Sequence, residues 1–241
     1  QSDTAPQPES SIAFSDVSAQ LNHIHTDEPF NDLERQPLLP NRLSQAGPPL
    51  TWTDFDGDGW EDLIIGAGRG GALAAYRNQA GSNFERITKR ITKIPSSRDH
   101  TAILPWGSER RDLLVGMSNY EDGVVAGDAI SLMQWDSDRV SSLVNARAFS
   151  FGSITAADLD ADGDLDLFVA GRVRPGRYPE PVDSFLLENT EGQLKPAFAF
   201  SQLGMVTGAI FSDLDGNGKP ELIVAREWDS LKVFTGNLQS M

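Results

Sequence analysis

The chain has 241 residues, of which 39% are hydrophobic, enough for one sizeable core or two small ones. Its 35 acidic and 20 basic residues give a formal net charge of −15, which argues against nucleic acid and anionic membrane surfaces as partners. Cysteine is absent, so disulfides and thiolate metal sites are excluded, and no apolar run is long enough to span a membrane.

Residues 1–11 are polar and rich in Pro and Gln, and we expect them to form a flexible tether. They lack the basic start and apolar middle of a signal peptide, so the chain reads as a mature or trimmed product. Residues 12–17 have the pattern of a short strand. His23 and His25 come next, and we interpret them as ordinary loop residues, with a transition-metal pair as the alternative.

Three acidic motifs of the same design begin at Asp54, Asp158 and Asp213. Each has oxygen-bearing side chains at its positions 1, 3, 5 and 9 and a glycine at position 6. Calcium takes roughly six to eight oxygen ligands from a tightly curled loop. The spacing therefore predicts three calcium sites.

An EF-hand does not fit these motifs, because position 12 would have to be a chelating glutamate and is apolar here: Ile65, Val169 and Val224. Each motif instead runs into a short apolar stretch that reads as a buried strand, at residues 63–65, 167–169 and 222–224. The residues before each motif also read as extended. Each loop is therefore predicted to be a calcium-clamped hairpin turn between adjacent strands.

Residues 66–71 match the dinucleotide-binding pattern G-x-G-x-x-G and follow a predicted strand. The next residues, 72–76, lead into another strand and not into a helix of 3.6-residue period. We therefore interpret the glycines as a turn between two strands.

A fourth copy of the repeat begins at residue 104 and ends at Asp112, which aligns with Asp62. Leu104, Trp106 and Ser108 stand where the other copies carry Asp, so this unit is expected to keep its strands and bind no metal. The four copies start at residues 54, 104, 158 and 213, in steps of 50, 54 and 55. A unit of that size fits one four-stranded propeller blade.

The sequence thus predicts an all-β fold, a β-propeller of four-stranded blades spanning residues 12–241. The blade units are placed near residues 50–98, 99–149, 150–204 and 205–241. Further strands are predicted at residues 73–77, 84–87, 184–187, 193–199 and 231–234. The fourth unit lacks an outer strand, and residues 12–17 are predicted to fill that place by pairing with residues 231–234.

A basic cluster, Arg172, Arg174, Arg177 and Tyr178, lies in a Pro-rich insertion between two strands of the third unit. Loops on rigid scaffolds often carry recognition, and arginine forks beside an aromatic ring suit a carboxylated sugar or an acidic peptide. The alternative is that these arginines pair with acidic residues of neighbouring blades.

The aromatic and histidine residues outside the motifs are given structural roles. Trp52 and Trp106 are predicted to lie in the core between blades, and Trp60 and Trp228 to be more exposed. His100 is expected to be structural. Neither a Cys-His nor a Ser-His-Asp constellation can be assembled from the sequence.

The three motifs resemble FG-GAP or VCBS repeats, the calcium-loop blades of integrin α-subunit β-propellers and of many secreted bacterial proteins. Residues 36–40, 43–48 and 171–179 resemble more specifically the bacterial VCBS-repeat proteins that often carry an ASPIC/UnbV domain. The resemblance covers roughly residues 12–236. Propellers of this kind usually have seven blades, so the four units form either a closed four-bladed ring or part of a seven-bladed one.

The resemblance implies calcium on the blade loops. Carried over by position, the side-chain ligands are Asp54, Asp56, Asp58 and Asp62 in the first loop, Asp158, Asp160, Asp162 and Asp166 in the second, and Asp213, Asp215, Asn217 and Glu221 in the third. Position 7 contributes its backbone carbonyl, which gives Trp60, Asp164 and Lys219. The third site is expected to be the weakest, because Asn217 lacks a charge, Glu221 is longer than Asp and Lys219 is basic.

The resemblance also implies adhesion or ligand binding outside the cytoplasm. The leading hypothesis is a non-enzymatic, calcium-stabilised propeller that binds a glycan or a protein, secreted or extracellular (periplasm or cell surface) and bacterial. One alternative is a polysaccharide lyase or hydrolase in which the Arg-Tyr loop neutralises a uronate and moves a proton. Another is a structural segment of a larger adhesin.

Overall fold

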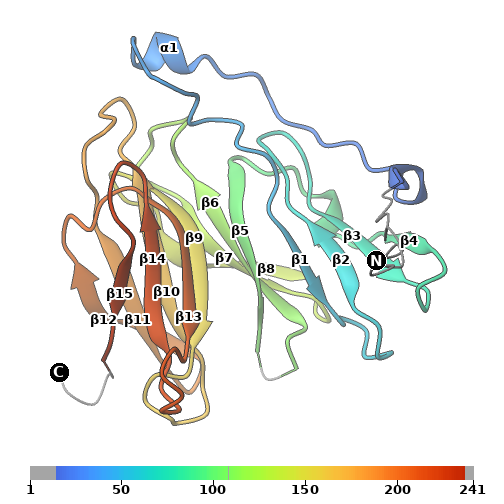
Figure 1. The fold of residues 1–241 in the computed structure, drawn as a ribbon. Helices are drawn as coiled ribbons and strands as arrows, with labels where there is room; N and C mark the ends of the chain where they lie inside the picture. Colours follow the sequence, from blue (N-terminus) through green and yellow to red (C-terminus); the bar gives the residue numbers. More distant parts are fainter. Residues whose placement is uncertain (1–14, 108, 237–241) are drawn as a thin grey trace, which may run out of the picture.

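The computed structural model of the chain describes residues 15–107 and 109–236 and is almost entirely β. Four antiparallel sheets stand side by side in a fan (Figure 1). Each sheet is a meander of consecutive strands, so sequence order and spatial order agree within it. This arrangement confirms the predicted all-β, blade-based architecture.

The first sheet contains β1 (Leu50–Thr53), β2 (Asp62–Ile65), β3 (Ala74–Asn78) and β4 (Phe84–Ile87). The second contains β5 (Asp99–Trp106), β6 (Asp112–Ser118), β7 (Asp128–Gln134) and β8 (Arg139–Asn145). The third contains β9 (Ser150–Ala157), β10 (Asp166–Val173), β11 (Ser184–Thr190) and β12 (Gln193–Phe200). The fourth contains β13 (Val206–Ser212), β14 (Glu221–Arg226) and β15 (Lys232–Phe234).

Within residues 15–107 and 109–236, helix is confined to three short pieces, η1 (Ser18–Gln20), α1 (Asp32–Arg35) and η2 (Ile91–Lys93). Among the residues that the structure describes, no helix is long and apolar enough to cross a membrane. The turn predicted for residues 66–71 lies between β2 and β3, with no helix in it, so the dinucleotide pattern is a strand-to-strand connection.

The core fills the spaces between neighbouring sheets. Successive residues of a strand point to opposite faces, so a middle strand of a blade can be buried on both sides. On β6, Leu113 packs in the cluster shared with the first sheet and Leu114 in the cluster shared with the third. On β10, Leu167 and Phe168 divide between the second and fourth sheets in the same way. Burial on both faces explains the uninterrupted apolar runs of the sequence.

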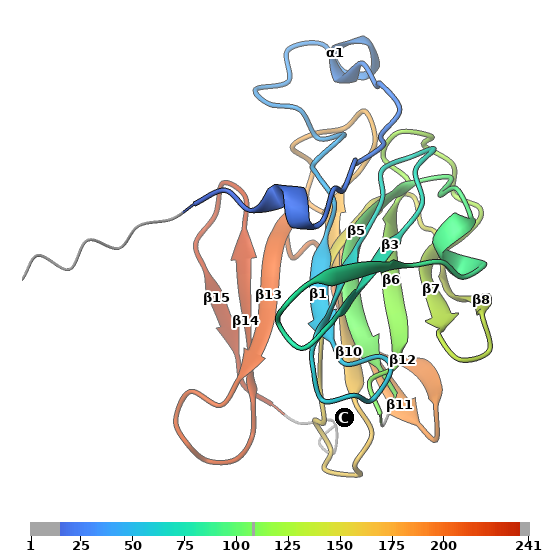
Figure 2. The same ribbon diagram turned by 90° about the vertical axis from the view of Figure 1, so that its right-hand side faces the viewer.

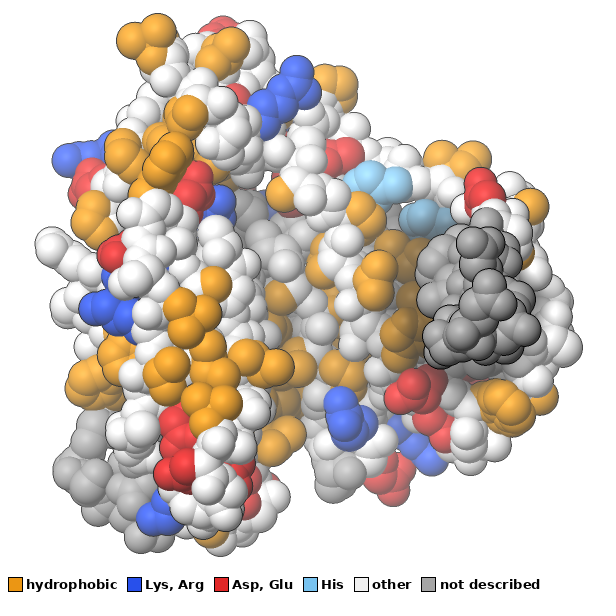
Figure 3. Space-filling model, in the orientation of Figure 1, with side chains coloured by type: hydrophobic (Ala, Val, Ile, Leu, Met, Phe, Trp, Pro, Cys, Tyr) orange, Lys and Arg blue, Asp and Glu red, His pale blue; other side chains and the backbone are white. Residues whose placement is uncertain are grey.

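The first strands of the sheets are neighbours across the blades: β1 lies against β5, β5 against β9, and β9 against β13. No sheet closes into a ring, so β1 and β13 stand at the two ends of the described arc. Apolar side chains are exposed at these ends, as the space-filling view shows over β13 to β15 (Figure 3). Ile210 of β13 and Val233 of β15 are both exposed. The repeats thus build consecutive blades of an open arc.

Trp52 is not in the core between blades, contrary to the prediction. Its side chain in β1 is 42% exposed and packs against Phe84, with ring centroids 6.0 Å apart. The reason is that β1 has a neighbouring blade on one side only. Trp106 does pack at the core between the second and third sheets, while Trp60 and Trp228 are exposed as predicted.

The predicted closing strand is only partly covered by the structure. Residues 12–14 lie outside the described residues, as does the predicted tether, and residues 15–17 are not in a strand. Within the described chain, β15 pairs with β14 alone. The pairing of residues 12–17 with residues 231–234 therefore stays a prediction.

One long segment crosses the upper edge of the sheets. This strap, residues 21–49, runs from η1 beside β4 over to α1 and back down to β1 (Figures 1 and 2). Phe30, Leu39 and Leu43 of the strap pack near Tyr120 and Tyr178. The strap also bonds to three blades, through Glu28 N to Arg69 O (3.0 Å), Arg35 Nη2 to Glu121 O (2.7 Å) and Gln36 Nε2 to Tyr178 O (2.6 Å).

Candidate metal centres

The three acidic loops occupy equivalent places in the fold. They join β1 to β2, β9 to β10 and β13 to β14, and all three lie at the lower edge of the sheets, opposite the strap (Figure 1). Each is a hairpin between paired antiparallel strands, as predicted. The fold therefore repeats the same turn on three of its four blades.

The same hydrogen bonds shape each loop. The carboxylate at position 1 accepts from the backbone amides of positions 4 and 6, at 2.7–3.1 Å. The oxygen at position 5 accepts from the amide of position 7, at 2.8 Å in all three loops. The position-7 residues are Trp60, Asp164 and Lys219, and each makes this contact through its backbone amide. Side-chain oxygens thus accept the hydrogen bonds of loop amides that have no strand partner.

Glycine at position 6 has a conformational reason. Gly59, Gly163 and Gly218 have φ of +91°, +95° and +83°, a region that residues with a Cβ rarely adopt. Position 4 also has positive φ, and in the second loop it is Ala161, at +64°. The double left-handed turn curls the loop so that its carboxylates face inward.

The position-9 residue anchors each loop to the sheet. Asp62, Asp166 and Glu221 are buried and accept from the position-2 amide at 3.3, 2.9 and 2.9 Å. Asp62 and Asp166 also accept from an amide on the third strand of the blade, at 2.8 and 2.9 Å. Burial, with help from Asp56 and Asp58, raises the pKa of Asp62 to about 6, and burial also raises the pKa of Asp166.

Replacing Asp166 with alanine is expected to lower the free energy of unfolding of the calcium-free protein by about 2 kcal/mol, because the amides of Leu159 and Asn189 lose their acceptor. Denaturant unfolding in the presence of a chelator measures this. The control is Asp164→Ala in the same loop, whose carboxylate accepts one bond from Glu191 N and should cost about 0.5 kcal/mol. Equal losses for the two variants would contradict the anchoring role.

Three carboxylates converge in each loop, with one oxygen of each within 4.8 Å of the others: Asp54, Asp56 and Asp58; Asp158, Asp160 and Asp166; and Asp213, Asp215 and Glu221. The predicted side chains of Asp62 and Asp162 lie outside these groups. Oxygen donors gathered this closely fit a hard divalent cation such as calcium.

Basic side chains distinguish the loops. Arg77 Nε lies 2.5 Å from Asp56 Oδ2, an ion pair inside the first predicted ligand set that no sequence spacing indicated. Arg111, from the second sheet, helps to lower the pKa of Asp54, after the amides that bond to this carboxyl. The third loop carries Lys219. Among the described residues, no Lys or Arg forms an ion pair with the second loop at Asp158, Asp162 or Asp166.

The fourth copy of the motif, which lies in the second sheet, keeps its two strands. Asp112 begins β6 and its Oδ1 accepts from Trp135 N at 3.2 Å, as Asp62 Oδ1 accepts from Asn78 N. Leu104 and Trp106 are part of β5 and pack at the core between the second and third sheets. Ser108 lies outside the described residues. The loss of acidic residues has left the blade intact.

The basic cluster of the third blade is held in ion pairs. Arg172 Nη2 lies 2.6 Å from Glu227 Oε2, and Arg174 and Arg177 both pair with Glu180, at 3.3 and 2.5 Å. Tyr178 is buried; its hydroxyl donates to Glu227 at 2.8 Å and accepts from the Trp228 indole N–H. The Arg172–Glu227 pair reaches the neighbouring blade, as in the alternative, whereas Glu180 lies in the same insertion as Arg174 and Arg177.

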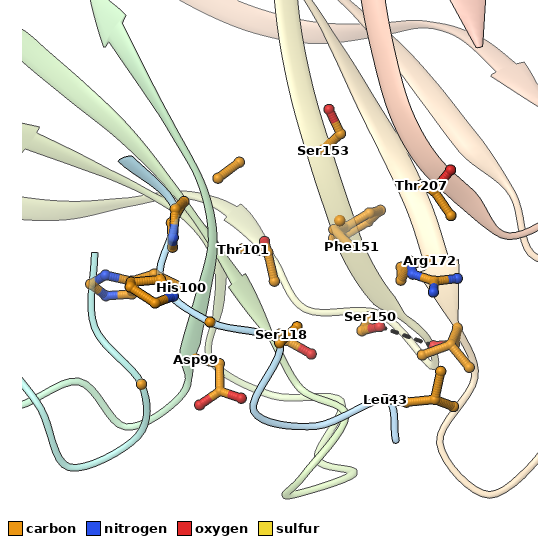
Figure 4. A pocket seen from close by; sticks show the side chains of 18 of the residues that line it. Leu43, Asp99, His100, Thr101, Ser118, Ser150, Phe151, Ser153, Arg172 and Thr207 are labelled. Carbon is orange, nitrogen blue, oxygen red and sulfur yellow. Dashed lines mark hydrogen bonds between the residues drawn. The ribbon is translucent and has the colours of Figure 1, made fainter. Parts of the chain in front are cut away.

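A cavity of about 450 Å³ lies beneath the strap. Asp99, His100 and Thr101 of β5 stand on one side and Arg172 of β10 on the other (Figure 4). His100 is buried, and its Nδ1 accepts from Ala67 N at 3.1 Å, which agrees with the expected structural role. His23 contacts the Tyr76 hydroxyl at 3.0 Å.

Two segments of the chain match known repeat families. Residues 50–82 match the FG-GAP repeat, and residues 158–224 match an FG-GAP-like repeat. Together the two segments contain all three acidic loops, and the fourth copy, which keeps Asp112 as its acidic residue, lies between them. A comparison with curated proteins found no match. The matches do not extend to the ASPIC/UnbV-associated group, so that part of the resemblance stays a prediction.

Proposed function

We propose that this FG-GAP-repeat chain is a secreted or extracellular bacterial module that binds a glycan or a protein, and that its three acidic loops hold calcium as part of the scaffold. FG-GAP repeats fit a propeller used for ligand binding or adhesion. The observation that carries the calcium assignment is the repeated loop frame, in which the same hydrogen bonds turn three carboxylates toward one point on three blades.

Charge supports a cation at each loop. Three carboxylates within 4.8 Å of one another repel, and a divalent ion offsets most of that charge. The chain as a whole has a net charge of −15, so bound calcium also reduces repulsion across the molecule. Since the loops close hairpins at the edge away from the strap, the ion stabilises blade geometry and the recognition surface lies elsewhere.

The three loops are proposed to differ in affinity. The second is expected to bind calcium most tightly, because its four predicted side chains are all Asp and no described Lys or Arg pairs with Asp158, Asp162 or Asp166. In the first loop Arg77 competes with calcium for Asp56. In the third, Asn217 lacks a charge and Lys219 is basic, which keeps it the weakest predicted site.

The ligand is proposed to bind on the strap side, where Arg172 lines the cavity beside the Arg-Tyr loop. Arg177 is the most exposed of the three arginines, so a carboxylated sugar or an acidic peptide would meet it first. The enzymatic alternative draws no comparable support. The Tyr178 hydroxyl is already engaged with Glu227 and Trp228, and proton transfer to a substrate would require breaking those contacts.

Titration calorimetry of the metal-stripped protein with calcium tests the proposal. The control is a triple loop variant with Asp56→Asn, Asp160→Asn and Asp215→Asn, which removes one carboxylate from each loop. It keeps the side-chain oxygens that accept from the position-5 amides. We expect calcium-dependent heat in the wild type and affinities reduced about tenfold or more in the variant. Identical titrations, or no heat in either protein, would overturn the assignment.

A further inference from the structure

A separate group of carboxylates lies at the upper edge of the sheets, away from the three loops. Asp27 comes from the strap, Asp99 begins β5, and Glu121 lies in the connection from β6 to β7. One oxygen of each lies within 4.8 Å of the other two. None of these residues belongs to an acidic loop or to the segments that match FG-GAP repeats.

Glu121 points into this group without the partners that a buried carboxylate requires. Its side chain is only 5% exposed, and neither carboxylate oxygen accepts a hydrogen bond from any described residue. The one cation among the described residues that pairs with it is Arg69, whose Nε lies 3.4 Å from Oε2, and no described residue donates a hydrogen bond to Oε1. Asp27 Oδ1 is likewise buried and without a hydrogen bond. Buried acceptors are almost always satisfied in folded proteins, so these oxygens indicate a missing ligand.

The charges around the group do not balance. Arg69 is the cation that reaches it, and its Nε is shared between Glu121 and Glu28, which lies 3.0 Å away. Asp99 Oδ1 accepts from Arg69 N at 2.8 Å, a contact with a backbone amide that brings no positive charge. Three clustered carboxylates and Glu28 therefore face one guanidinium. A divalent ion would correct the excess.

We propose that Asp27, Asp99 and Glu121 bind a divalent cation of the Mn²⁺ type. Carboxylate oxygens suit Mn²⁺, which also accepts imidazole. His25 Nε2 has no hydrogen-bond partner in the described part of the chain and lies 4.0 Å from Asp27 Oδ2, at the rim of the group. Asp27 and Asp99 line the cavity beneath the strap, so water can complete the coordination from that side.

The site would tie the strap to the second blade. Asp27 is the strap's ligand, while Asp99 and Glu121 belong to one sheet and its connecting loop. Hydrogen bonds already hold the strap at Glu28 and Arg35. A cation at Asp27 would add a further attachment in the segment between η1 and α1. Cation binding is therefore expected to order the strap where it covers the cavity.

The test uses the full chain and Mn²⁺, followed by the loss of the free-ion electron paramagnetic resonance signal. The triple loop variant serves as the background, because its loops are weakened while the strap site is unchanged. We expect one Mn²⁺ to remain bound in this background and Glu121→Gln to weaken that binding about tenfold or more. The matched control is Glu28→Gln, which changes a carboxylate on the same Arg69 but outside the group and should shift the affinity less than about threefold.

A second readout reports on the strap itself. Mn²⁺ should slow amide hydrogen exchange around Asp27 in the background variant and leave it unchanged after Glu121→Gln. If Glu121→Gln does not fold, Asp27→Asn removes a ligand from the strap and carries the same expectations. The proposal is overturned if the background variant binds no Mn²⁺, or if binding and strap exchange are the same with and without the Glu121 carboxylate.

Discussion

Removing calcium from the wild-type protein is expected to lower its melting temperature by roughly 8–16 °C. A ligand present at about ten times its dissociation constant stabilises the folded state by about 1.4 kcal/mol per site, so three loops contribute about 4 kcal/mol. For a chain of this length each kcal/mol corresponds to roughly 2–4 °C. Scanning calorimetry in calcium and in chelator measures the difference.

The physical source of this effect is the hairpin geometry. Each ion would hold the turn between the first two strands of a blade, and in the second loop it would also meet the buried Asp166, whose ionised form is costly without a cation. The triple loop variant should melt close to the calcium-free wild type and lose most of its response to calcium. A wild type that melts at the same temperature in both buffers would contradict calcium as part of the scaffold.

The pH dependence of stability is expected to carry a large contribution from His100. Burial lowers the pKa of this imidazole to about 4, against about 6.5 in an unfolded chain. Between these values the unfolded state binds the proton and the folded state does not. The contribution of neutral His100 is therefore complete above pH 6.5 and is lost as the pH falls toward 4, a change of about 3 kcal/mol.

The comparison of wild type with His100→Asn isolates this contribution. Asparagine keeps an acceptor for Ala67 N but does not titrate. The pH dependence of wild-type unfolding alone does not isolate His100. The pKa values of Asp62 and Glu121 are raised, to about 6 and 7, so these two carboxyl groups stabilise the folded protein increasingly as the pH falls through that range.

We expect the free energy of unfolding of the wild type, relative to that of His100→Asn, to fall by about 3 kcal/mol from pH 7 to pH 4. Denaturant unfolding in chelator at a series of pH values measures it. His23→Asn is the control, since the pKa of His23 is also lowered by burial but its side chain is less enclosed, and it should give a smaller change. A difference between wild type and His100→Asn that does not vary with pH would mean that His100 titrates equally in both states.

The blade loops could be read from the sequence because most of the contacts that form them are local. Asp158 and Asp166 are eight residues apart, and both accept from amides of the turn between them, although Asp166 also accepts from Asn189 N on β11. Apolar runs after each loop marked strands buried on both faces, and the repeat period marked the blades. The fourth copy followed from the period even though three of its four acidic positions are lost.

Contacts between residues far apart in the sequence could not be read in this way. Arg77 of β3 pairs with Asp56 of the first loop, and Arg172 of β10 pairs with Glu227 of the next blade, but no sequence spacing indicates either ion pair. Trp52 is a large aromatic residue of the kind expected in a core, yet it is partly exposed because β1 lies at an end of the arc. Its burial depends on whether another blade stands beside β1, which the residues around it do not encode.

The sequence by itself determined the repeats, the hairpin loops and their acidic residues, because backbone turns and neighbouring side chains are fixed within a few residues of one another. Only the tertiary structure decided the open arc, the course of the strap and the meeting of Asp27, Asp99 and Glu121. Those three carboxylates come from a strap, a strand and a loop. Long-range packing brings them together, so no local pattern in the chain records their proximity.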